Sequence, residues 1–186
     1  MERSNDSRAG VRPGQLRMFA TALAIVVADQ VAKRVVASFM RLGESINLLG
    51  PVVRFTRTEN TGAAFGMLRG RSLWFIIVSA VASIAIVLLR RRIASMRPRE
   101  QMAFGLVLGG AVGNLIDRIR LGAVVDFIDI GFGDLRWPAF NVADSAITIG
   151  VAVLAFGLLF LPRPESLPAP AAERGAAGPS PNQDGT

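Results

Sequence analysis

Long apolar segments alternate with shorter polar ones along this chain. A helix needs about 20 mostly apolar residues to cross the hydrocarbon core of a bilayer, with a range of roughly 17 to 25. We interpret four segments as transmembrane helices, at residues 16–36, 72–89, 101–119 and 141–161. The second is uncharged throughout, and the fourth is uncharged from residue 145 onward. The pattern predicts an α-helical membrane protein with four transmembrane helices.

Two connecting segments have the composition and the period of β-strands. The loop at residues 37–71 contains SINLLGPVVRFTRTEN, which is rich in β-branched residues. The sequence GAVVDFIDIG alternates, so that Val124, Asp126 and Ile128 share one face and Asp129 lies on the other. We therefore expect a small β-containing region outside the membrane.

The composition shifts divide the chain into three parts. We expect a cytoplasmic N-terminal tail at residues 1–15, a membrane domain at 16–161 and a disordered cytoplasmic tail at 162–186, which is rich in Pro, Ala, Gly and Ser. The first apolar segment ends in Asp29 and Lys33 rather than in a small-residue cleavage site. It is therefore predicted to be a retained helix and not a secretory signal.

Arginines near the helix ends predict the orientation, because short cytoplasmic segments carry an excess of Lys and Arg. The outer loops also contain arginines, so this bias is modest. It places both termini and the loop at residues 90–100 in the cytoplasm. The arginines that carry it are Arg8, Arg12, Arg17, Arg90, Arg91, Arg92, Arg97, Arg99 and Arg163.

With this topology, the unusual polar residues near the helices all fall on the outer side. Four independent helices are not expected to place them together by chance, so they predict one site at the outer membrane surface. The polar residues are Asp29, Lys33, Asn114, Asp117, Arg118, Asp126, Asn141 and Asp144.

A stripe of small residues, Gly105, Gly109 and Gly113, is expected to hold the third helix tightly against a neighbour.

The residue inventory restricts the chemistry of such a site. The chain has no cysteine and no histidine, which excludes a thiolate nucleophile, a Ser-His arrangement and the HExxH metal site. We expect no metal and no cofactor. The net charge of +7 in a chain that is 51% hydrophobic indicates contact with anionic lipid rather than with nucleic acid. Two carboxylates that share a proton remain as an acid–base pair able to cleave a peptide bond.

Several aspartates compete for that role. Asp126 has no basic residue within four positions, and Asp144 opens the fourth helix with no cation nearby. The alternatives are an ordinary loop acid for Asp126 and a helix N-cap for Asp144. Asp129 stays open as a candidate on the opposite face of its strand, and Asp134 is interpreted as a turn residue.

Two aspartates have local cations, which favours a structural role for each. Asp29 lies one helical turn before Lys33, the spacing of an ion pair on a helix. Asp117 has Asn114 before it and Arg118 directly after it, which suggests a structural ion pair or hydrogen-bond network. A dyad of serine with Lys33 is disfavoured, because Asp29 is the simpler partner for this lysine.

Four blocks, ADQVAK, RTENTGAAFGM, GGAVGNLIDRIRLGAVVDFIDI and FNVADSAITIG, resemble those of bacterial lipoprotein signal peptidase (signal peptidase II), in order from about residue 18 to 161. The resemblance implies a four-helix, multi-pass aspartyl protease of the bacterial inner membrane, and we expect it to be a monomer. It cleaves diacylglyceryl-modified prolipoproteins before the lipidated cysteine. The loop at residues 37–71 is then expected to form a small sheet that cradles the substrate.

The same resemblance implies a role for each matching residue. Asp126 and Asp144 fall at the positions of the catalytic pair. The expected substrate-binding positions are Asn60, Gly62, Asn114, Arg118 and Asn141. The expected supporting positions are Asp29, Lys33 and Asp117.

Two other classes of function fit parts of the pattern. Acids within membrane helices often mark the ion path of a transporter or channel. Here the charges gather at one end, and none lies in the middle of the second or fourth helix. A scaffold with no activity is the other alternative, and it predicts that Asp126 and Asp144 tolerate replacement by Asn.

Overall fold

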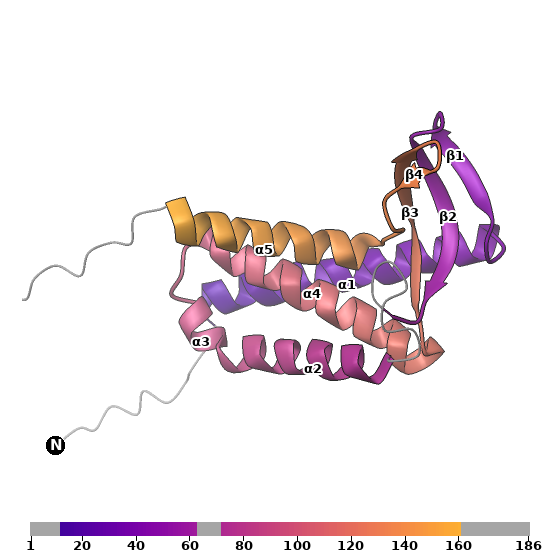
Figure 1. The fold of residues 1–186 in the computed structure, drawn as a ribbon. Helices are drawn as coiled ribbons and strands as arrows, with labels where there is room; N and C mark the ends of the chain where they lie inside the picture. The colour runs from indigo at the N-terminus through magenta and orange to yellow at the C-terminus, as the bar shows by residue number, and fades with distance from the viewer. Residues whose placement is uncertain (1–11, 63–71, 161–186) are drawn as a thin grey trace, which may run out of the picture.

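A computed structural model describes residues 12–62 and 72–160 of the chain. Within these residues, four helices of 17 to 27 residues run back and forth beside one another, and a small sheet stands at one end of them (Figure 1). The helices are α1 (Pro13–Phe39), α2 (Ser72–Leu88), α4 (Pro98–Leu121) and α5 (Val142–Phe160). A short helix, α3 (Arg90–Ile93), lies at the end opposite the sheet. The predicted mostly helical fold with a small β region is confirmed.

Helix α1 begins three residues earlier than the apolar pattern predicts. Pro13 occupies its first turn, where the missing N–H costs nothing and the fixed φ suits a helix. The Arg12 N–H donates to Oε1 of Gln15 at 3.2 Å, which satisfies a further donor at this end. Residues 1–11 and the predicted tail at 162–186 lie outside the described residues.

Helix α4 lies at the centre and contacts α1, α2 and α5. Its glycines allow the close approach that their spacing predicts. A Cβ on Gly105 would lie 2.6 Å from the Met18 oxygen of α1, and one on Gly109 would lie 2.6 Å from the Ala22 oxygen. On the other side of α4, Gly110 lies against the Ala143 backbone of α5. Side chains at these positions would push the neighbouring helices apart.

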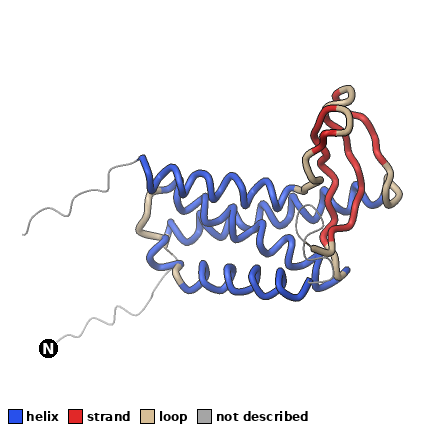
Figure 2. Tube along the Cα trace, viewed as in Figure 1, coloured by secondary structure: helices blue, strands red, loops and turns tan. Residues whose placement is uncertain are grey.

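The four strands form an antiparallel sheet in the order β1-β2-β3-β4, drawn in red in Figure 2. Strand β1 spans Ser45–Leu49, β2 spans Val53–Asn60, β3 spans Val124–Phe132 and β4 spans Leu135–Arg136. Between β2 and β3, Thr58 faces Asp126 and Asn60 faces Val124. This register makes Asn60 and Asp126 diagonal neighbours, close enough for their side chains to meet.

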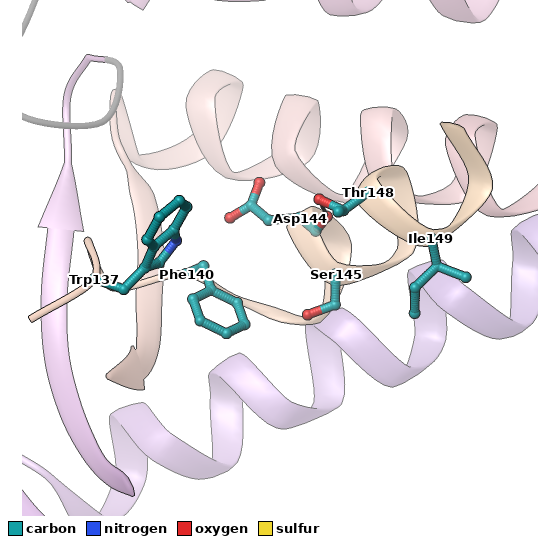
Figure 3. A pocket seen from close by; sticks show the side chains of 6 residues that line it. All are labelled: Trp137, Phe140, Asp144, Ser145, Thr148 and Ile149. Atoms are coloured by element: carbon teal, nitrogen blue, oxygen red, sulfur yellow. Dashed lines mark hydrogen bonds between the residues drawn. The ribbon is translucent and has the colours of Figure 1, made fainter. Parts of the chain in front are cut away.

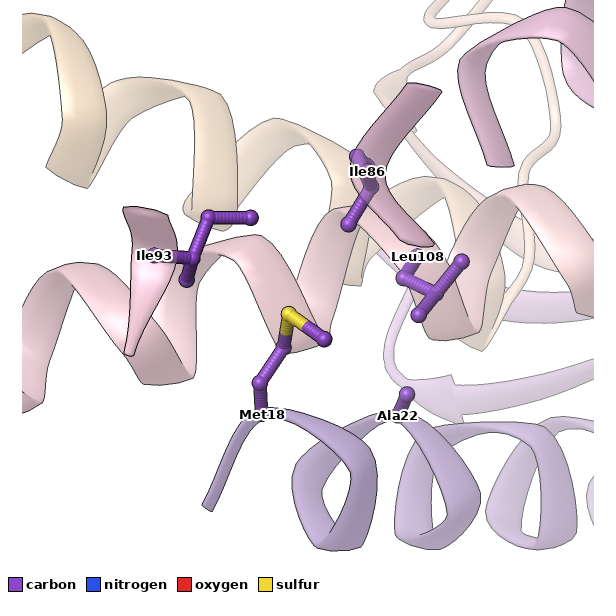
Figure 4. Close-up of a cluster of buried hydrophobic side chains, with 5 residues drawn as sticks. All are labelled: Met18, Ala22, Ile86, Ile93 and Leu108. Carbon is purple, nitrogen blue, oxygen red and sulfur yellow. The ribbon is translucent and has the colours of Figure 1, made fainter. Parts of the chain in front are cut away.

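Two apolar clusters hold the helices and the sheet together. The first joins α1, α2, α3 and α4, and its buried side chains are Met18, Ala22, Ile86, Ile93 and Leu108 (Figure 4). The second joins the end of α1 to the sheet through Val36, Met40 and Phe127. Phe127 also meets Phe55 of β2 edge to face, with ring centroids 5.6 Å apart. This cluster fixes the sheet against the helices.

The outward faces of the helices are strongly apolar. Large side chains such as Leu23 and Val27 on α1 and Val151 and Leu158 on α5 are exposed. Among the described residues, α4 and α5 are long and apolar enough to cross a membrane, and the apolar stretch Leu73–Leu88 of α2 is shorter. Length and hydropathy thus support two of the four predicted transmembrane helices.

Candidate active site

The predicted polar residues converge where the helices meet the sheet. Strand β3 supplies Asp126, the first turn of α5 supplies Asp144, and the end of β2 supplies Asn60. The halves of α1 and α4 that lie nearer the sheet supply Asp29, Lys33, Asp117 and Asn114. Residues that are more than 100 positions apart in the sequence therefore form one connected cluster, as their predicted location on one side requires.

Backbone pairing holds the start of α5 beside β3. Phe140 forms a bridge with Ile128: its N–H donates to the Ile128 oxygen at 3.0 Å, and its oxygen accepts from the Ile128 N–H at 2.8 Å. The next residue, Asn141, is fully buried. Asp126 lies two residues before Ile128 on β3, so the bridge places Asn141 next to Asp126.

Asn141 and Asp144 form a capping box at the start of α5. The Asp144 N–H donates to Oδ1 of Asn141 at 2.9 Å, and Oδ2 of Asp144 accepts from the Asn141 N–H at 3.3 Å. The N-cap is therefore Asn141, and the N-cap alternative for Asp144 is wrong, because Asp144 is the third residue of the helix. Its other oxygen, Oδ1, stays available to the site.

Two asparagine amides link the two carboxylates of the predicted catalytic pair. Nδ2 of Asn141 donates to Oδ1 of Asp126 at 2.7 Å and to Oδ1 of Asn114 at 3.1 Å. Nδ2 of Asn114 then donates to Oδ1 of Asp144 at 2.7 Å. The path Asp126–Asn141–Asn114–Asp144 is continuous, so the structure brings Asp126 and Asp144 into one network.

The environment of Asp126 favours its protonated form. Its side chain is buried and bonded to the neutral amides of Asn60, at 3.1 Å, and Asn141. Burial, and then the negative charge of Asp144, raise the pKa of Asp126 to about 7, although both amides and the charge of Lys33 act in the opposite direction. Asp126 thus titrates near neutral pH.

A buried ion-pair cluster supports this network from α1 and α4. Nζ of Lys33 lies 2.8 Å from Oδ2 of Asp29 and 2.7 Å from Oδ2 of Asp117. The predicted pair of Asp29 and Lys33 is confirmed. The ion pair predicted for Asp117 is present, but its partner is Lys33 rather than the adjacent Arg118. Asp117 further accepts from the Val125 N–H at 3.2 Å, which ties α4 to the strand that carries Asp126.

Arg118 and Gly62 lie at the edge of the cluster. The guanidinium of Arg118 stands 5.1 Å from the ring centroid of Phe75 on α2 and donates to the backbone oxygen of Asn114 at 3.5 Å. The Gly62 N–H donates to Oδ1 of Asn60 at 3.0 Å, so the turn after β2 fixes the Asn60 amide that faces Asp126. The structure thus places both residues near the predicted pair.

Asp129 is bound on the opposite face of β3, as the alternation predicts. It pairs with Arg54 and, at 2.6 Å, with Arg136, and it accepts from the Thr56 hydroxyl at 2.9 Å. Burial raises the pKa of Asp129, but the bonds from Arg54 and Arg136 outweigh it and leave the pKa below its usual value. Asp129 is therefore a structural carboxylate. Asp134 lies in the turn between β3 and β4, as predicted.

Asp144 forms part of the wall of a largely apolar pocket of about 420 Å³ (Figure 3). Trp137 and Phe140 lie on one side of the carboxylate, and α5 continues on the other with Ser145, Thr148 and Ile149. An apolar group of a substrate can therefore lie beside Asp144. In the described ranges, no group of three acidic residues is arranged to hold a metal ion.

The sequence did not single out every residue of the site. Gln30 was missed, although it donates to Oδ1 of Asp117 at 2.9 Å and to Oδ2 of Asp29 at 3.3 Å and so bridges both carboxylates. The available signal was its place between Asp29 and Lys33 on the same helix. The arginine partners of Asp129 were also missed, because they come from other strands.

Comparisons with known proteins show similarity to one family of membrane peptidases. A family model described as signal peptidase (SPase) II matches residues 21–160. A lipoprotein signal peptidase of Brevibacillus brevis is 48% identical over 133 residues, which cover 72% of this chain and 88% of the relative. One of Geobacillus kaustophilus is 43% identical over 147 residues, covering 77% of this chain and 94% of the relative. A solved bacterial membrane enzyme superposes with a TM-score of 0.69 at 37% identity, over 76% of this chain and 87% of the other.

Proposed function

Since the chain belongs to the signal peptidase II family, a family of peptidases that remove signal peptides from prolipoproteins, we propose that Asp126 and Asp144 are its catalytic pair. The observation that carries this proposal is the amide path that joins the two carboxylates. In residues 12–62 and 72–160, neither carboxylate forms an ion pair, whereas Asp29, Asp117 and Asp129 each do. A pair without a bound cation can hold one proton between its members.

The proposed reaction is hydrolysis of the peptide bond before the lipidated cysteine of a diacylglyceryl-modified prolipoprotein. The charged aspartate takes a proton from a water molecule, and the resulting hydroxide attacks the carbonyl carbon. The protonated aspartate gives its proton to the carbonyl oxygen. When the tetrahedral intermediate collapses, the C–N bond breaks, and the leaving amine takes up a proton from the aspartate that deprotonated the water. One hydroxyl of the intermediate returns its proton to the other aspartate, so the pair again holds one proton. The two carboxylates supply both acid and base, so the reaction calls for no cofactor or metal.

The pKa of Asp126 near 7 supports this residue as the holder of the shared proton. Asp144 then starts as the base. The amides of Asn114 and Asn141 already donate to the pair, and so they fix both carboxylates before the substrate arrives. Such positioning can supply a large share of the rate of an enzyme.

The proposed substrate-binding residues surround the pair. Arg118 is held by the ring of Phe75 and by the backbone oxygen of Asn114, which leaves guanidinium donors for a peptide carbonyl. Asn60 and Gly62 form the turn next to Asp126, where an extended substrate backbone can pass. Asn114 and Asn141 complete this set from α4 and α5. Asp29, Lys33 and Asp117 have the supporting role and hold α1, α4 and β3 together.

We further propose that α1, α2, α4 and α5 all cross the membrane. Their apolar outward faces support this, and α4 and α5 meet the length and hydropathy required. The sheet and the pair then lie at the outer face, and α3, with its three arginines, lies at the cytoplasmic face. This arrangement gives a multi-pass protein of the bacterial inner membrane with both termini in the cytoplasm, and we propose that it acts as a monomer.

The first test replaces each member of the pair by its neutral isostere. We expect Asp126→Asn and Asp144→Asn to lose about 100- to 10,000-fold in kcat on a diacylglyceryl-modified prolipoprotein, because each removes a general acid or base. Mass spectrometry of the purified proteins in detergent follows the loss of the signal peptide. Asp134→Asn is the matched control, since Asp134 is exposed in a turn.

The control variant is expected to cut at the wild-type rate. Near-normal activity in a folded Asp126→Asn or Asp144→Asn protein would show that the residue is not catalytic. If Asp134→Asn were also inactive, the loss of cleavage in the other two variants could not be attributed to Asp126 and Asp144.

A further inference from the structure

Lys33 is a buried cation next to the catalytic pair. Its side chain is 4% exposed, and its Nζ reaches Asp29 Oδ2 at 2.8 Å, Asp117 Oδ2 at 2.7 Å and Asn114 Oδ1 at 3.2 Å. An ammonium group has three donors and no acceptor. Three acceptors therefore match its full set of donors. Two of them are carboxylates that hold the ammonium, and the third is an amide of the active site.

The contact with Lys33 decides which way the Asn114 amide faces. Because the ammonium can only donate, the atom of Asn114 next to it has to be the oxygen. The nitrogen then points to Asp144, to which it donates at 2.7 Å. The same oxygen accepts from Nδ2 of Asn141 at 3.1 Å. A reversed amide would place its oxygen against the carboxylate of Asp144 and its nitrogen against two donors.

We propose that Lys33 is a positioning residue of the cleavage reaction, which acts by setting the orientation of the Asn114 amide and hence the hydrogen bonds that reach Asp144 and Asp126. The proposal rests on the proposed function of the two aspartates. It assigns to Lys33 more than the ion pair with Asp29, since a purely structural lysine needs its carboxylate partners and not the amide.

The charge of Lys33 also acts on the pair. It lowers the pKa of Asp126, against burial and the negative charge of Asp144, which raise that pKa. Among the described residues, the other charged groups around the pair are Arg118 on α4 and the carboxylates of Asp29 and Asp117, which bind the lysine itself. Removing the lysine charge is therefore expected to raise the pKa of Asp126 and to extend activity to higher pH.

The test compares Lys33→Met with Arg34→Met in the same prolipoprotein assay. Arg34 is the next residue of α1 and is exposed, so this control removes the same charge from the same helix without touching the site. For Lys33→Met we expect kcat to fall by about 10- to 100-fold, because small displacements of catalytic groups cost that much. We also expect the alkaline limb of its pH profile to move to higher pH. Arg34→Met is expected to match the wild type in both.

A second comparison covers the case in which Lys33→Met fails to fold, since it leaves two buried carboxylates without their cation. The double variant Lys33→Met/Asp117→Asn removes one charge of each sign, and Asp29 keeps its bonds from the Ala143 N–H at 3.0 Å and from Gln30. Its control is Asp117→Asn alone. We expect the double variant to have a lower kcat than this control and to lose activity at a higher pH.

The outcomes separate the two proposals. If the folded Lys33 variants match their controls in kcat and pH profile while Asp126→Asn is inactive, the role of Lys33 is overturned and the catalytic pair stands. If Asp126→Asn cuts normally, the catalytic pair is wrong, and the role of Lys33 falls with it.

Discussion

Two buried aspartates of β3 lie three residues apart in opposite electrostatic settings. Asp126 is bonded to neutral amides, and burial together with the charge of Asp144 raises its pKa to about 7. Asp129 is also buried, which acts to raise its pKa, but Arg54 and Arg136 hold that pKa below its usual value. Groups whose surroundings push their pKa values apart are suited to different tasks. Only the first of these two carboxyl groups titrates near the pH at which cells work.

This difference predicts the pH dependence of cleavage. The proposed catalytic pair needs one shared proton, and that proton leaves as the pH rises through the pKa of Asp126, so kcat/KM is expected to fall above about pH 7. The hydrogen bond from Asn60 lowers that pKa, and Asn60→Ala should therefore shift the falling limb to higher pH. Initial rates between pH 5 and about pH 9 measure this, as general acid–base catalysis gives bell-shaped profiles.

The same shift affects stability with a definite sign. Folded Asp126 binds its proton more tightly than the unfolded chain, whose Asp has the ordinary pKa of 3.8. The stabilisation is therefore complete below that value and is lost as the pH rises through about 7. In Asp126→Asn the melting temperature should not show this decline with rising pH.

The pH profile of cleavage gives the opposite check. If the falling limb of kcat/KM stays at the same pH in Asn60→Ala, the assignment of that limb to Asp126 is contradicted.

At the scale of elements, the start of α5 serves both the fold and the chemistry. Asn141 caps the helix with its side-chain oxygen and binds Asp126 with its side-chain nitrogen. Asp144 closes the capping box with one oxygen and accepts from Asn114 with the other. The position of this turn depends on Gly110 of α4, which lies against the Ala143 backbone. Helix packing therefore sets the geometry of the pair.

A comparison of two glycines tests this dependence. A Cβ on Gly110 would collide with the Ala143 oxygen, and a Cβ on Gly150 would lie 2.7 Å from the Ala103 oxygen, farther along the same helix pair. Each alanine variant is expected to lose about 1–3 kcal/mol of stability through overpacking. Gly110→Ala should also lose most of its activity, because it moves the turn that carries Asp144. Thermal unfolding and cleavage rates per folded protein measure both effects.

Gly150→Ala is the control in this pair, since it disturbs the same interface away from the site. Equal losses of activity in the two variants would contradict the view that Gly110 sets the position of Asp144. Unchanged stability in both would show that the helices adjust to the added methyl group.

The features that could be predicted from the sequence are those with a local signal. Apolar length gave the helices, alternation separated Asp126 from Asp129, and spacing paired Asp29 with Lys33. The remaining features depend on contacts between distant segments. Nothing local shows that Lys33 binds Asp117, or that Arg54 and Arg136 come from other strands to bind Asp129. The resemblance to the signal peptidase II family supplied the expected roles of Asn114 and Asn141, which local spacing could not.

At the scale of the whole molecule, the two ends of the helices differ in chemistry. One end carries the sheet and the buried polar cluster, and the other carries α3 with its three arginines (Figure 1). The apolar faces of the helices lie between these ends. A prolipoprotein has its acyl chains in the membrane, so a peptide bond next to the lipidated cysteine can reach a site only at the membrane surface. The polar end with Asp126 and Asp144 has that location if the proposed topology holds.

The absence of cysteine from the sequence makes this topology directly testable. We expect Asp134→Cys, in the turn between β3 and β4, to react with a membrane-impermeant maleimide on intact spheroplasts. Arg91→Cys, in α3, should react only after the membrane is permeabilised. Both positions are exposed, so access to the reagent depends on the side of the membrane and not on burial. Labelling in the reverse order would place the aspartate pair in the cytoplasm, where a secreted prolipoprotein could not present its cleavage site.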